Sequence, residues 1–526
     1  MLIDLDHLER DAACDVDICI VGAGPAGITL ALELSNQDLS CALLESGGFH
    51  ATAATRELNH GVARGQRSWP LTASRVRCLG GSSVRWRGWC RPLERADFQV
   101  RPWIEHSGWP VTFDDLAPWY RRAQAVCHAG QYWYGDLAAW ASDADVCLLD
   151  LSGAGIEQRL YMFSPVPDFG TEYLHCLEAA SIRGFVNATV TGLVPGPAGD
   201  RVEQVEARSR NGRRLVVRAS HVVLAAGAVE NARTLLAAQA RGVSWGGGWV
   251  GRAFADHPHV LAGVVVPSRA HDLRAYDAIT AAPGGWGRVA LALPEDAAQD
   301  LCVPGATAIL QPVPVGRGRA VWAILARSEQ VPNRASHVAL DSDLDGHGVP
   351  RAIVDWRLAR IDRLAVAALL DRLVDALPRA GLGEVVRQMS AEDVDWPSDL
   401  VGGCHHMGTT RMATDVRHGV VDRDGNVFGA RNLYVAGGSV FCTAGVANPT
   451  LTIVALALRL ANHIAGILGA ARPRRSWYEV AAGFGQRSGA HGAGDPDDET
   501  EAFLRRMSVE LTTRVRQIID EPGASA

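Results

Sequence analysis

Short apolar runs and helical apolar spacing alternate over the first fifty residues of the chain. Residues 17–21 (DICIV) form an apolar run rich in β-branched side chains, which predicts a strand. Apolar residues at helical spacing predict a helix over residues 25–34, and residues 41–44 predict a second strand. This order of strand, helix and strand indicates a βαβ unit, the building block of α/β proteins.

The second half of the chain carries a different pattern. Residues 321–325, 337–340 and 352–356 are short, apolar and partly β-branched, which is typical of strands in an antiparallel sheet. Residues 363–377 have the apolar spacing of a helix. We therefore expect a second unit in which helices lie behind a sheet.

A further long helix is predicted after Pro449. An apolar helical pattern runs over residues 451–464, and a proline at the first turn of a helix costs no hydrogen bond. The pattern contains Arg459, Asn462 and His463, so this helix is a poor candidate for a membrane span. We expect no membrane partner.

The composition changes again after Gly469. A basic, proline-containing stretch and a glycine-rich stretch to Gly494 predict a linker, and residues 495–520 predict a helix. Its apolar residues fall on one face, namely Phe503, Leu504, Met507, Leu511, Val515 and Ile518. Because no heptad repeat persists, we favour docking of this helix on its own chain over docking on a second subunit in a homo-oligomer.

Length, charge and cysteine usage narrow the class of protein. A chain of 526 residues exceeds the size at which one core keeps growing, so two domains are expected. The net charge is −7 and the arginines are dispersed, which argues against nucleic acid as a partner. The acidic N-terminus lacks the pattern of a secretory signal, and the 11 cysteines include no CxxC pair. We expect a cytoplasmic protein with free thiols and no metal site.

A glycine-rich turn follows the first predicted strand. In the segment GAGPAG, Gly22 permits a tight turn, Gly24 lets the backbone approach a pyrophosphate, and Gly27 permits close packing of the helix. The N-terminus of that helix attracts the anion. Glu45 ends the second strand, 18 residues after Gly27, where a carboxylate accepts hydrogen bonds from a ribose. These features together predict a dinucleotide site, without choosing FAD over NAD.

Segments far apart in the chain select the cofactor by resemblance. Together they resemble the glucose-methanol-choline (GMC) family of FAD-dependent alcohol oxidoreductases, with bacterial sugar dehydrogenases and pyranose 2-oxidases as the nearest groups. The segments are RCLGGSSVRW at 77–86, ATVTGL at 188–193, HVVLAAGAVENARTLL at 221–236, GR and DHP within 251–258, HHMGTTRM at 405–412, NLYVAGGS at 432–439 and ANPTLT at 447–452.

The resemblance implies an α/β fold, α+β overall, in which a Rossmann-type FAD-binding domain is interleaved with a substrate domain built on an antiparallel sheet backed by helices. The expected division is 1–108, 170–265 and 395–470 for FAD binding, 109–169 for a lid or substrate-domain insertion, 266–394 for substrate binding, and 471–526 for the linker and tail helix. The implied cofactor-binding residues are Gly22, Gly24, Pro25, Ala26, Gly27, Glu45, Ser46, Arg77, Gly80, Gly81, Ser82, Ser83, Val190, Ala226, Gly227, Gly438, Ser439, Asn448, Pro449 and Thr450.

The resemblance also implies the catalytic residues. Oxidation of an alcohol by a flavin needs a proton acceptor over the ring, and histidine is suited to this near neutral pH. The family motifs place His405 as that base and Asn448 as the amide that orients the hydroxyl. His406 is the rival for His405, because neighbours in an extended segment point to opposite faces.

Two residues depart from the motifs of the relatives. Pyranose 2-oxidases attach FAD covalently to a histidine where this chain has Arg85, so FAD is expected to be bound non-covalently. Cys442 replaces a usual proline, and we interpret it as structural because it has no partner cysteine nearby.

We expect oxidation of a secondary alcohol on a sugar, glycoside or glycosylated natural product, with O2, a quinone or a carrier protein as electron acceptor. The alternatives are oxidation of a sterol or polyketide alcohol and, less favoured, a non-redox lyase on the same fold. Tryptophan clusters at 86–89 and 103–140 suit either a sugar pocket or a core. Glu329 and Gln330 are interpreted as surface residues rather than sugar ligands.

Overall fold

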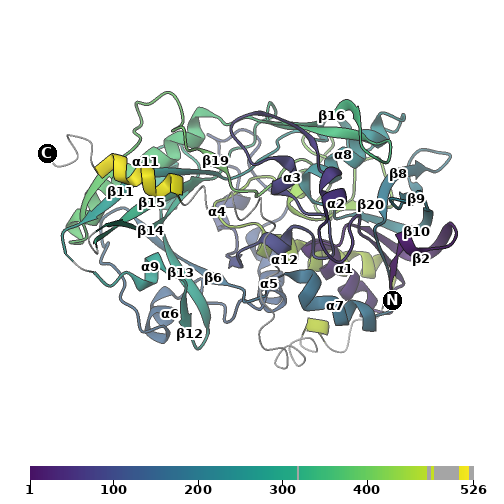
Figure 1. The fold of residues 1–526 in the computed structure, drawn as a ribbon, viewed down its shortest axis with the longest axis horizontal. Helices are drawn as coiled ribbons and strands as arrows, with labels where there is room; N and C mark the ends of the chain where they lie inside the picture. The colour runs from purple at the N-terminus through teal and green to yellow at the C-terminus, as the bar shows by residue number, and fades with distance from the viewer. Residues whose placement is uncertain (167, 270, 317–318, 471–475, 479–508, 520–526) are drawn as a thin grey trace.

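The computed structural model describes the chain except residues 167, 270, 317–318, 471–475, 479–508 and 520–526. Figure 1 shows an elongated molecule with a strand-rich half at each end of its long axis. The N-terminal strands lie in one half, and β11 (Pro258–Pro267), β14 (Ala306–Gly316) and β15 (Arg319–Ser328) lie in the other.

The first sheet has the strand order β1-β7-β3-β2-β10-β9-β8, with β20 beside β10. Its strands are β1 (Leu2–Asp4), β2 (Ala12–Val21), β3 (Cys41–Leu44), β7 (Ile182–Val186), β8 (Thr189–Pro195), β9 (Val202–Arg208), β10 (Arg214–Leu224) and β20 (Leu433–Val435). Neighbouring strands pair in parallel from β1 through β7, β3 and β2 to β10, and β20 also pairs in parallel with β10. Strand β9 pairs antiparallel with both β10 and β8. The strands predicted at 17–21 and 41–44 are confirmed as neighbours, as a βαβ unit requires.

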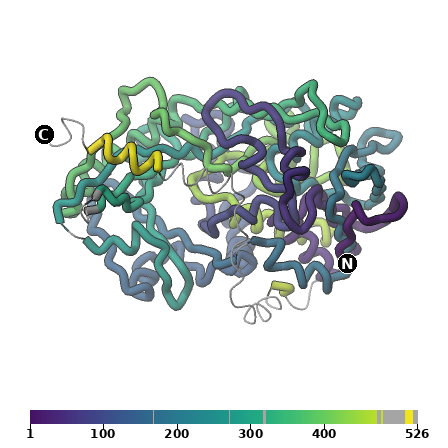
Figure 2. Tube along the Cα trace, viewed as in Figure 1, coloured from purple at the N-terminus to yellow at the C-terminus, as the bar shows by residue number. Residues whose placement is uncertain are grey.

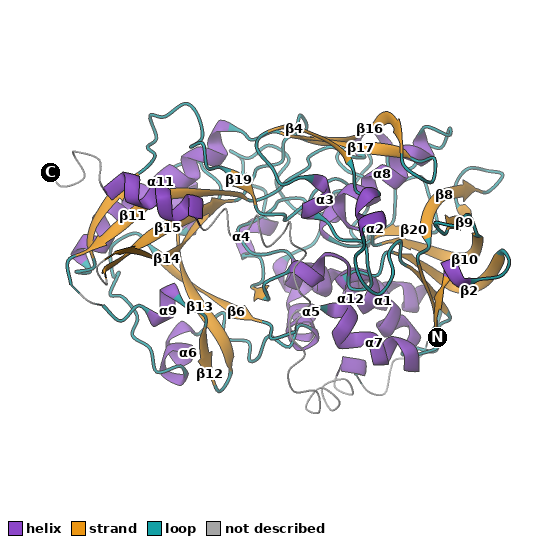
Figure 3. Ribbon diagram, in the orientation of Figure 1, coloured by secondary structure: helices purple, strands orange, loops and turns teal. Residues whose placement is uncertain are grey.

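Helices cover this sheet and carry the chain between its strands. The predicted helix at 25–34 is α1 (Pro25–Ser35), and the one predicted after Pro449 is α12 (Thr450–Ile467). The two pack together, and α5 (Phe113–Val126) packs on α12 (Figure 3). By length and composition α12 is apolar enough to span a membrane, but most of it is buried in this core.

The second sheet is antiparallel and forms the other half of the molecule. Its order is β18-β11-β15-β14-β13-β6-β5, with β12 beside β13 and β19 beside β11. The remaining strands are β5 (Trp89–Cys90), β6 (Glu157–Phe163), β12 (Thr280–Ala282), β13 (Gly285–Ala292), β18 (Gly383–Arg387) and β19 (Val401–Gly402). The predicted helix at 363–377 is α11 (Arg360–Arg379), which packs against β11, β14, β15 and β18. The fold class expected from the sequence, a Rossmann-type unit interleaved with an antiparallel sheet backed by a helix, is therefore confirmed.

The grouping of two predicted strands differs from the sequence interpretation. The strands at 337–340 and 352–356 exist, as β16 (His337–Leu344) and β17 (Pro350–Trp356), but they do not join the second sheet. They form a separate three-stranded sheet in which β17 pairs in parallel with β4 (Gly61–Gly65). Strand spacing along the sequence does not specify a partner almost 300 residues away, which is why the pattern was misassigned.

The remaining helices are short and lie in the connections. They are α2 (Ala53–Glu57), α3 (Leu71–Ser74), α4 (Arg95–Phe98), α6 (Leu137–Asp143), α7 (Phe169–Ala179), α8 (Gly227–Gln239), α9 (Arg274–Asp277) and α10 (Glu295–Asp300), with 3-10 turns η1 (Leu5–His7), η2 (Gly81–Arg85), η3 (Gly247–Trp249) and η4 (Gly438–Val440). Figure 2 shows that the N-terminal segment and the segment before residue 470 converge in the same half of the molecule, although they are far apart in the sequence.

Candidate active site

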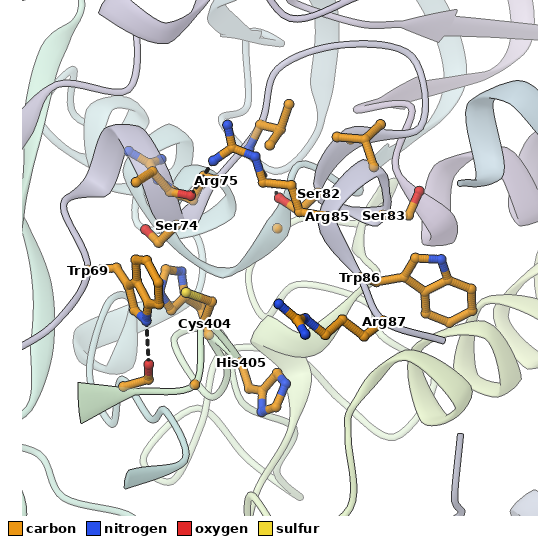
Figure 4. A pocket seen from close by; sticks show the side chains of 18 of the residues that line it. Trp69, Ser74, Arg75, Ser82, Ser83, Arg85, Trp86, Arg87, Cys404 and His405 are labelled. Carbon is orange, nitrogen blue, oxygen red and sulfur yellow. Dashed lines mark hydrogen bonds between the residues drawn. The ribbon is translucent and has the colours of Figure 1, made fainter. Parts of the chain in front are cut away.

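A cavity of about 2400 Å³ extends from the glycine turn of the first sheet to the face of the second. Small-molecule pockets commonly have volumes of roughly 300–1,000 Å³, so this cavity has room for a dinucleotide and a second ligand. Figure 4 shows its middle, with the segment from Arg85 to Arg87 on one side and the segment that carries Cys404 and His405 beneath it. Trp69 also lines the cavity, and its Nε1 donates to the carbonyl of Gly402 at 2.8 Å, close to the segment that carries Cys404 and His405.

The glycine turn has the shape that a pyrophosphate site needs. Gly22 has φ +104°, which favours glycine, and a Cβ at Gly27 would lie 1.8 Å from the carbonyl oxygen of Gly22. Nothing lies within 4 Å of the Cβ position of Gly24. The turn therefore packs closely against α1 on one side and leaves open space at Gly24, beside the N-terminus of α1. These residues fit the dinucleotide that the sequence predicts.

Glu45 lies at the floor of this end of the cavity. Its Oε2 accepts from the backbone N–H of Ala23 at 2.9 Å, and its Oε1 accepts from that of Gly47 at 2.9 Å. Burial raises the pKa of Glu45, and the two backbone hydrogen bonds oppose that shift. Next to it, Arg77 donates to Ser46 Oγ at 3.0 Å. The carboxylate is thus fixed in place by the backbone.

Most residues implied by the family motifs meet at the cavity. Those that line it are Gly22, Gly24, Pro25, Ala26, Glu45, Ser46, Arg77, Gly81, Ser82, Ser83, Val190, Ala226, Gly227, His405, Gly438, Asn448, Pro449 and Thr450. Three lie behind the lining. Gly27 packs on the turn, Gly80 donates its N–H to the carbonyl of Ala23 at 2.9 Å, and Ser439 Oγ accepts from Asn231 at 2.9 Å.

The close approach of α1 to the turn gives a first prediction. Gly27→Ala places a methyl group against the Gly22 carbonyl, so turn and helix must separate. We expect FAD affinity to fall about tenfold, for a cost of roughly 1–3 kcal/mol in strain. Flavin content after dialysis measures the loss, with Gly466→Ala as the matched control, because Gly466 is a helix glycine outside the cavity lining with nothing within 4 Å of its Cβ position. Equal flavin content in Gly27→Ala and wild type would contradict the close-packing role.

His405 sits at the centre of a hydrogen-bonded chain of side chains. Its Nε2 lies 3.1 Å from Asn448 Nδ2, and its Nδ1 lies 2.8 Å from His257 Nδ1. Arg327 Nη1 donates to Asn448 Oδ1 at 2.8 Å, and His257 Nε2 lies 2.7 Å from the carbonyl of Gly445. The chain therefore runs from a guanidinium through an amide and two imidazoles to a backbone carbonyl.

The hydrogen bonds among these side chains determine which ring nitrogen carries the proton in His405 and in His257. Arg327 offers only donors, so Asn448 turns its oxygen to Arg327 and its NH2 to His405, whose Nε2 must accept. At the far end, the carbonyl of Gly445 accepts the proton of His257 Nε2, which leaves His257 Nδ1 as an acceptor. His405 then carries its proton on Nδ1 and donates it to His257. The lone pair of His405 Nε2 faces Asn448 at the cavity wall.

Burial and neighbouring charges keep His405 neutral. Burial, followed by the charges of His257, His259 and Arg327, holds the pKa of His405 well below its usual value of 6.5. Burial also lowers the pKa of both His257 and His259 to about 3, with Arg327 as the next cause. A neutral imidazole is an acceptor, so this electrostatic setting maintains the form of His405 that can take a proton.

Asp256 positions the loop that carries His405. Its carboxylate accepts from the backbone N–H of His405 at 2.7 Å and from that of Cys404 at 3.1 Å. Burial raises the pKa of Asp256 to about 7, against the backbone hydrogen bonds that lower it. His406 also lines the cavity, but its ring packs on Phe254 and its Nε2 lies 3.9 Å from Asp256 Oδ2. His405, rather than its rival, therefore makes the contact with Asn448.

Sequence reasoning missed Arg327, His257 and His259 as members of the site. His257 had a signal, because its DHP segment is one of the family motifs, but no pattern indicated that it touches His405. Arg327 and His259 are paired across β15 and β11, and that register comes only from the fold. Arg327 also lies over the rings of Tyr161, at 5.0 Å, and Trp89, at 5.8 Å.

Other interpretations from the sequence are settled by burial. Glu329 and Gln330 are buried, so the surface interpretation was wrong. Glu329 pairs with Arg101 at 2.6 Å, and Gln330 accepts from Trp356 at 2.8 Å. Cys442 is buried and donates to the carbonyl of Met412 at 3.1 Å, as a structural thiol does.

One of the two tryptophan clusters lines the cavity, and the other packs within the protein. Trp86 and Trp89 line the cavity together with Trp69. In the second cluster, Trp109 and Trp140 are buried in the core, and Trp103 donates to the carbonyl of Val303. Within the part of the chain that the structure describes, the 103–140 cluster contributes nothing to the cavity wall.

Comparisons with known proteins agree with this architecture. Residues 332–457 match the family described as GMC oxidoreductase, which confirms the resemblance drawn from the motifs. The C-glycoside 3-oxidase of Microbacterium trichothecenolyticum is 38% identical over 24% of this chain and 23% of its own length. Paromamine 6'-oxidase of Streptomyces fradiae is 36% identical over 26% of this chain and 24% of its own length. Each of these two matches therefore spans about a quarter of the relative's length. The 6'''-hydroxyparomomycin C oxidase of Streptomyces lividus is 27% identical over 89% of this chain and 94% of its own.

Solved structures share the fold over nearly their whole length. A formate oxidase of Aspergillus oryzae RIB40, studied for FAD modification, has a TM-score of 0.60 at 15% identity and covers 87% of this chain and 99% of its own. Pyridoxine 4-oxidase from Mesorbium loti has a TM-score of 0.55 at 17% identity and covers 85% and 99%. At this identity the likeness establishes the fold.

Proposed function

Because the chain contains a GMC oxidoreductase domain at residues 332–457, we propose that it oxidises a secondary alcohol of a sugar, glycoside or glycosylated natural product with non-covalently bound FAD. The single observation that carries the proposal is the hydrogen-bonded chain that makes His405 Nε2 an acceptor beside Asn448, in one cavity with the glycine turn. The relatives named above, a C-glycoside oxidase and two aminoglycoside-related oxidases, support a sugar as substrate.

The cofactor is supported by the shape of the turn and its neighbours. Gly22, Gly24 and the N-terminus of α1 would hold the pyrophosphate, and Glu45 would face the ribose. When bound, FAD supplies the acceptor for the hydride that leaves the alcohol carbon. Arg85 lies in the cavity wall where a covalent tether would need a histidine, and a guanidinium forms no such bond. This substitution supports non-covalent binding.

The residues of the chain then handle the hydroxyl. His405 Nε2 accepts the hydroxyl proton, while the NH2 of Asn448 donates to the hydroxyl oxygen and orients the carbon that it carries. Arg327 prevents the Asn448 amide from flipping, because its guanidinium has no lone pair to accept from NH2. The hydroxyl takes the place of the direct hydrogen bond between Asn448 Nδ2 and the single lone pair of His405 Nε2, while Arg327 and His257 keep both side chains oriented.

A screen of sugars and glycosides for anaerobic bleaching of the flavin tests the proposal. A yellow protein that a sugar bleaches supports it. Bleaching by sterol or polyketide alcohols alone would favour the second candidate, and cleavage of substrate with the flavin permanently oxidised would show a lyase. Oxygen consumption against dye reduction on one substrate then separates O2 from a quinone or a carrier protein as acceptor.

The pH dependence of flavin reduction follows from the pKa of His405. Its pKa is lowered, so the ring stays in the accepting form through neutral pH and gains a proton only well below 6.5. We expect kcat/KM for anaerobic reduction to be flat from about pH 8 to 6.5 and to fall at lower pH. Arg327→Met removes one of the lowering charges and moves this acid limb upward. An acid limb that stays in place in Arg327→Met would contradict the electrostatic role.

Location and assembly remain part of the proposal. All 11 cysteines are free thiols, which suits the reducing conditions of the cytoplasm. We propose a cytoplasmic enzyme, a location that cell fractionation tests.

Docking of the tail helix on its own chain supports a monomer over a tail-mediated homo-oligomer, and sedimentation analysis distinguishes the two.

A further inference from the structure

A helix at residues 509–519 lies well beyond the segment that matches the family. Figure 1 shows it, at the yellow end of the colour scale, beside β11 and β15. Two stripes of residues run along it at the i, i+4, i+7 spacing of one helix face. The apolar stripe is Leu511, Val515 and Ile518, and the polar stripe is Glu510, Arg514 and Gln517.

The apolar stripe docks the helix on its own chain. Val515 and Ile518 are buried, and they pack in a cluster with Leu261, Val264, Val313, Val321 and Ala323. The partners belong to β11, β14 and β15 of the second sheet. Self-docking, favoured from the sequence, is confirmed for residues 509–519, whereas Phe503, Leu504 and Met507 lie outside the described residues.

The polar stripe faces the cavity. Glu510, Arg514 and Gln517 all belong to its lining. Arg514 Nη1 donates to Asp399 Oδ1 at 2.8 Å, and Asp399 Oδ2 in turn accepts from the backbone N–H of Leu261 at 2.7 Å. Arg67 Nη2 lies 4.0 Å from Glu510 Oε2, in an ion pair whose two side chains are more than half exposed. The Arg514–Asp399 ion pair therefore adds to the packing that holds the helix, and Glu510 and Gln517 present hydrogen-bonding side chains at the cavity wall.

Strand register places this wall at a distance from the catalytic pair. Arg327, Leu325 and Ala323 alternate onto one face of β15, paired with Thr307, Ile309 and Gln311 of β14. The Arg327 end of this face meets Asn448, and the Ala323 end meets the tail helix. At about 3.3 Å per residue, the two ends are about 13 Å apart. A single pyranose ring held at His405 does not reach the helix.

We propose that the 509–519 helix forms a distal subsite that binds the second sugar ring of a disaccharide-like glycoside, whose first ring reacts at His405 and Asn448. The inference rests on the proposed function. Ile309, Leu325 and Leu261 give the intervening stretch an apolar floor, on which the carbon face of a ring can lie. The carboxylate of Glu510 and the amide of Gln517 then accept from and donate to the hydroxyls of the second ring.

The test compares methyl β-glucoside with cellobiose and maltose in the full-length holoenzyme. In Glu510→Ala/Gln517→Ala, we expect the ratio of kcat/KM for the better disaccharide to that for methyl glucoside to fall about tenfold, the effect of two lost hydrogen bonds. The loss should appear in KM rather than kcat, because the contact is remote from the reacting carbon. Arg516→Ala, on the exposed face of the same helix, is the control and should keep the wild-type ratio.

A second variant tests whether docking of the 509–519 helix, and not only the side chains of Glu510 and Gln517, is needed for the preference for disaccharides. Ile518→Asp introduces a charge into the docking cluster and should lower the same ratio, while the flavin spectrum reports that the fold is intact. Equilibrium dialysis of methyl β-glucoside, cellobiose and maltose measures binding without turnover. Wild-type protein that binds neither disaccharide more tightly than methyl glucoside overturns the inference, as does an unchanged ratio in the double variant. Failure of the proposed function would instead appear as no bleaching by any sugar, a separate readout.

Discussion

Replacing His405 with alanine is expected to slow anaerobic reduction of the flavin by a sugar at least about a hundredfold. The substitution removes the Nε2 that accepts the hydroxyl proton and leaves the NH2 of Asn448 without its acceptor. The cost of losing a positioned general base is typically about a hundredfold to ten-thousandfold. Stopped-flow absorbance of the flavin measures the rate, and His405→Ala should retain FAD because the cradle at Gly22 and Gly24 is untouched.

The matched control is the neighbouring His406→Ala. Its ring packs on Phe254 and makes no contact with Asn448, so its loss should cost less than about tenfold in rate. A His405→Ala variant that reduces flavin within about threefold of wild type would refute the base assignment. A larger loss in His406→Ala than in His405→Ala would transfer the role to the rival residue.

The elements that build the cofactor site were predictable because local rules specify them. Strand, glycine turn and helix follow each other within 20 residues, and the φ of Gly22 and the tight contact at Gly27 are conditions that only glycine meets. The helix after Pro449 was predicted for the same reason, since its start and its apolar spacing are both local. Sequence motifs then brought His405 and Asn448 to the same place.

The parts that could not be predicted depend on pairing across long distances. Arg327 faces Asn448 only because β15 pairs with β11 in one register, and a shift of one residue would turn it to the other face. The parallel pairing of β17 with β4 has the same cause. Burial of Glu329 depends on Arg101, 228 residues away, and no local pattern distinguishes that pair from two surface charges. The active site thus combines motifs that the sequence displays with a polar setting that only the fold supplies.

Replacing His257 with leucine is expected to slow flavin reduction by about a hundredfold while leaving FAD binding unchanged. His257 does not face the substrate, so its effect is one of positioning: its Nδ1 accepts the Nδ1 proton of His405 and thereby keeps His405 Nε2 free to accept. Without that acceptor, His405 can place its proton on Nε2, the tautomer that cannot take the hydroxyl proton. A wrong tautomer at a catalytic histidine is known to cost up to about ten-thousandfold.

Rescue by asparagine distinguishes this role from simple packing. The Oδ1 of an asparagine occupies nearly the position of a histidine Nδ1 and accepts the same proton, so His257→Asn should recover most of the rate that His257→Leu loses. Leucine fills the volume better than asparagine does, and a purely structural role would therefore predict the reverse order. Equal rates in the two variants, measured on protein of equal flavin content, would show that the His405 tautomer is set elsewhere.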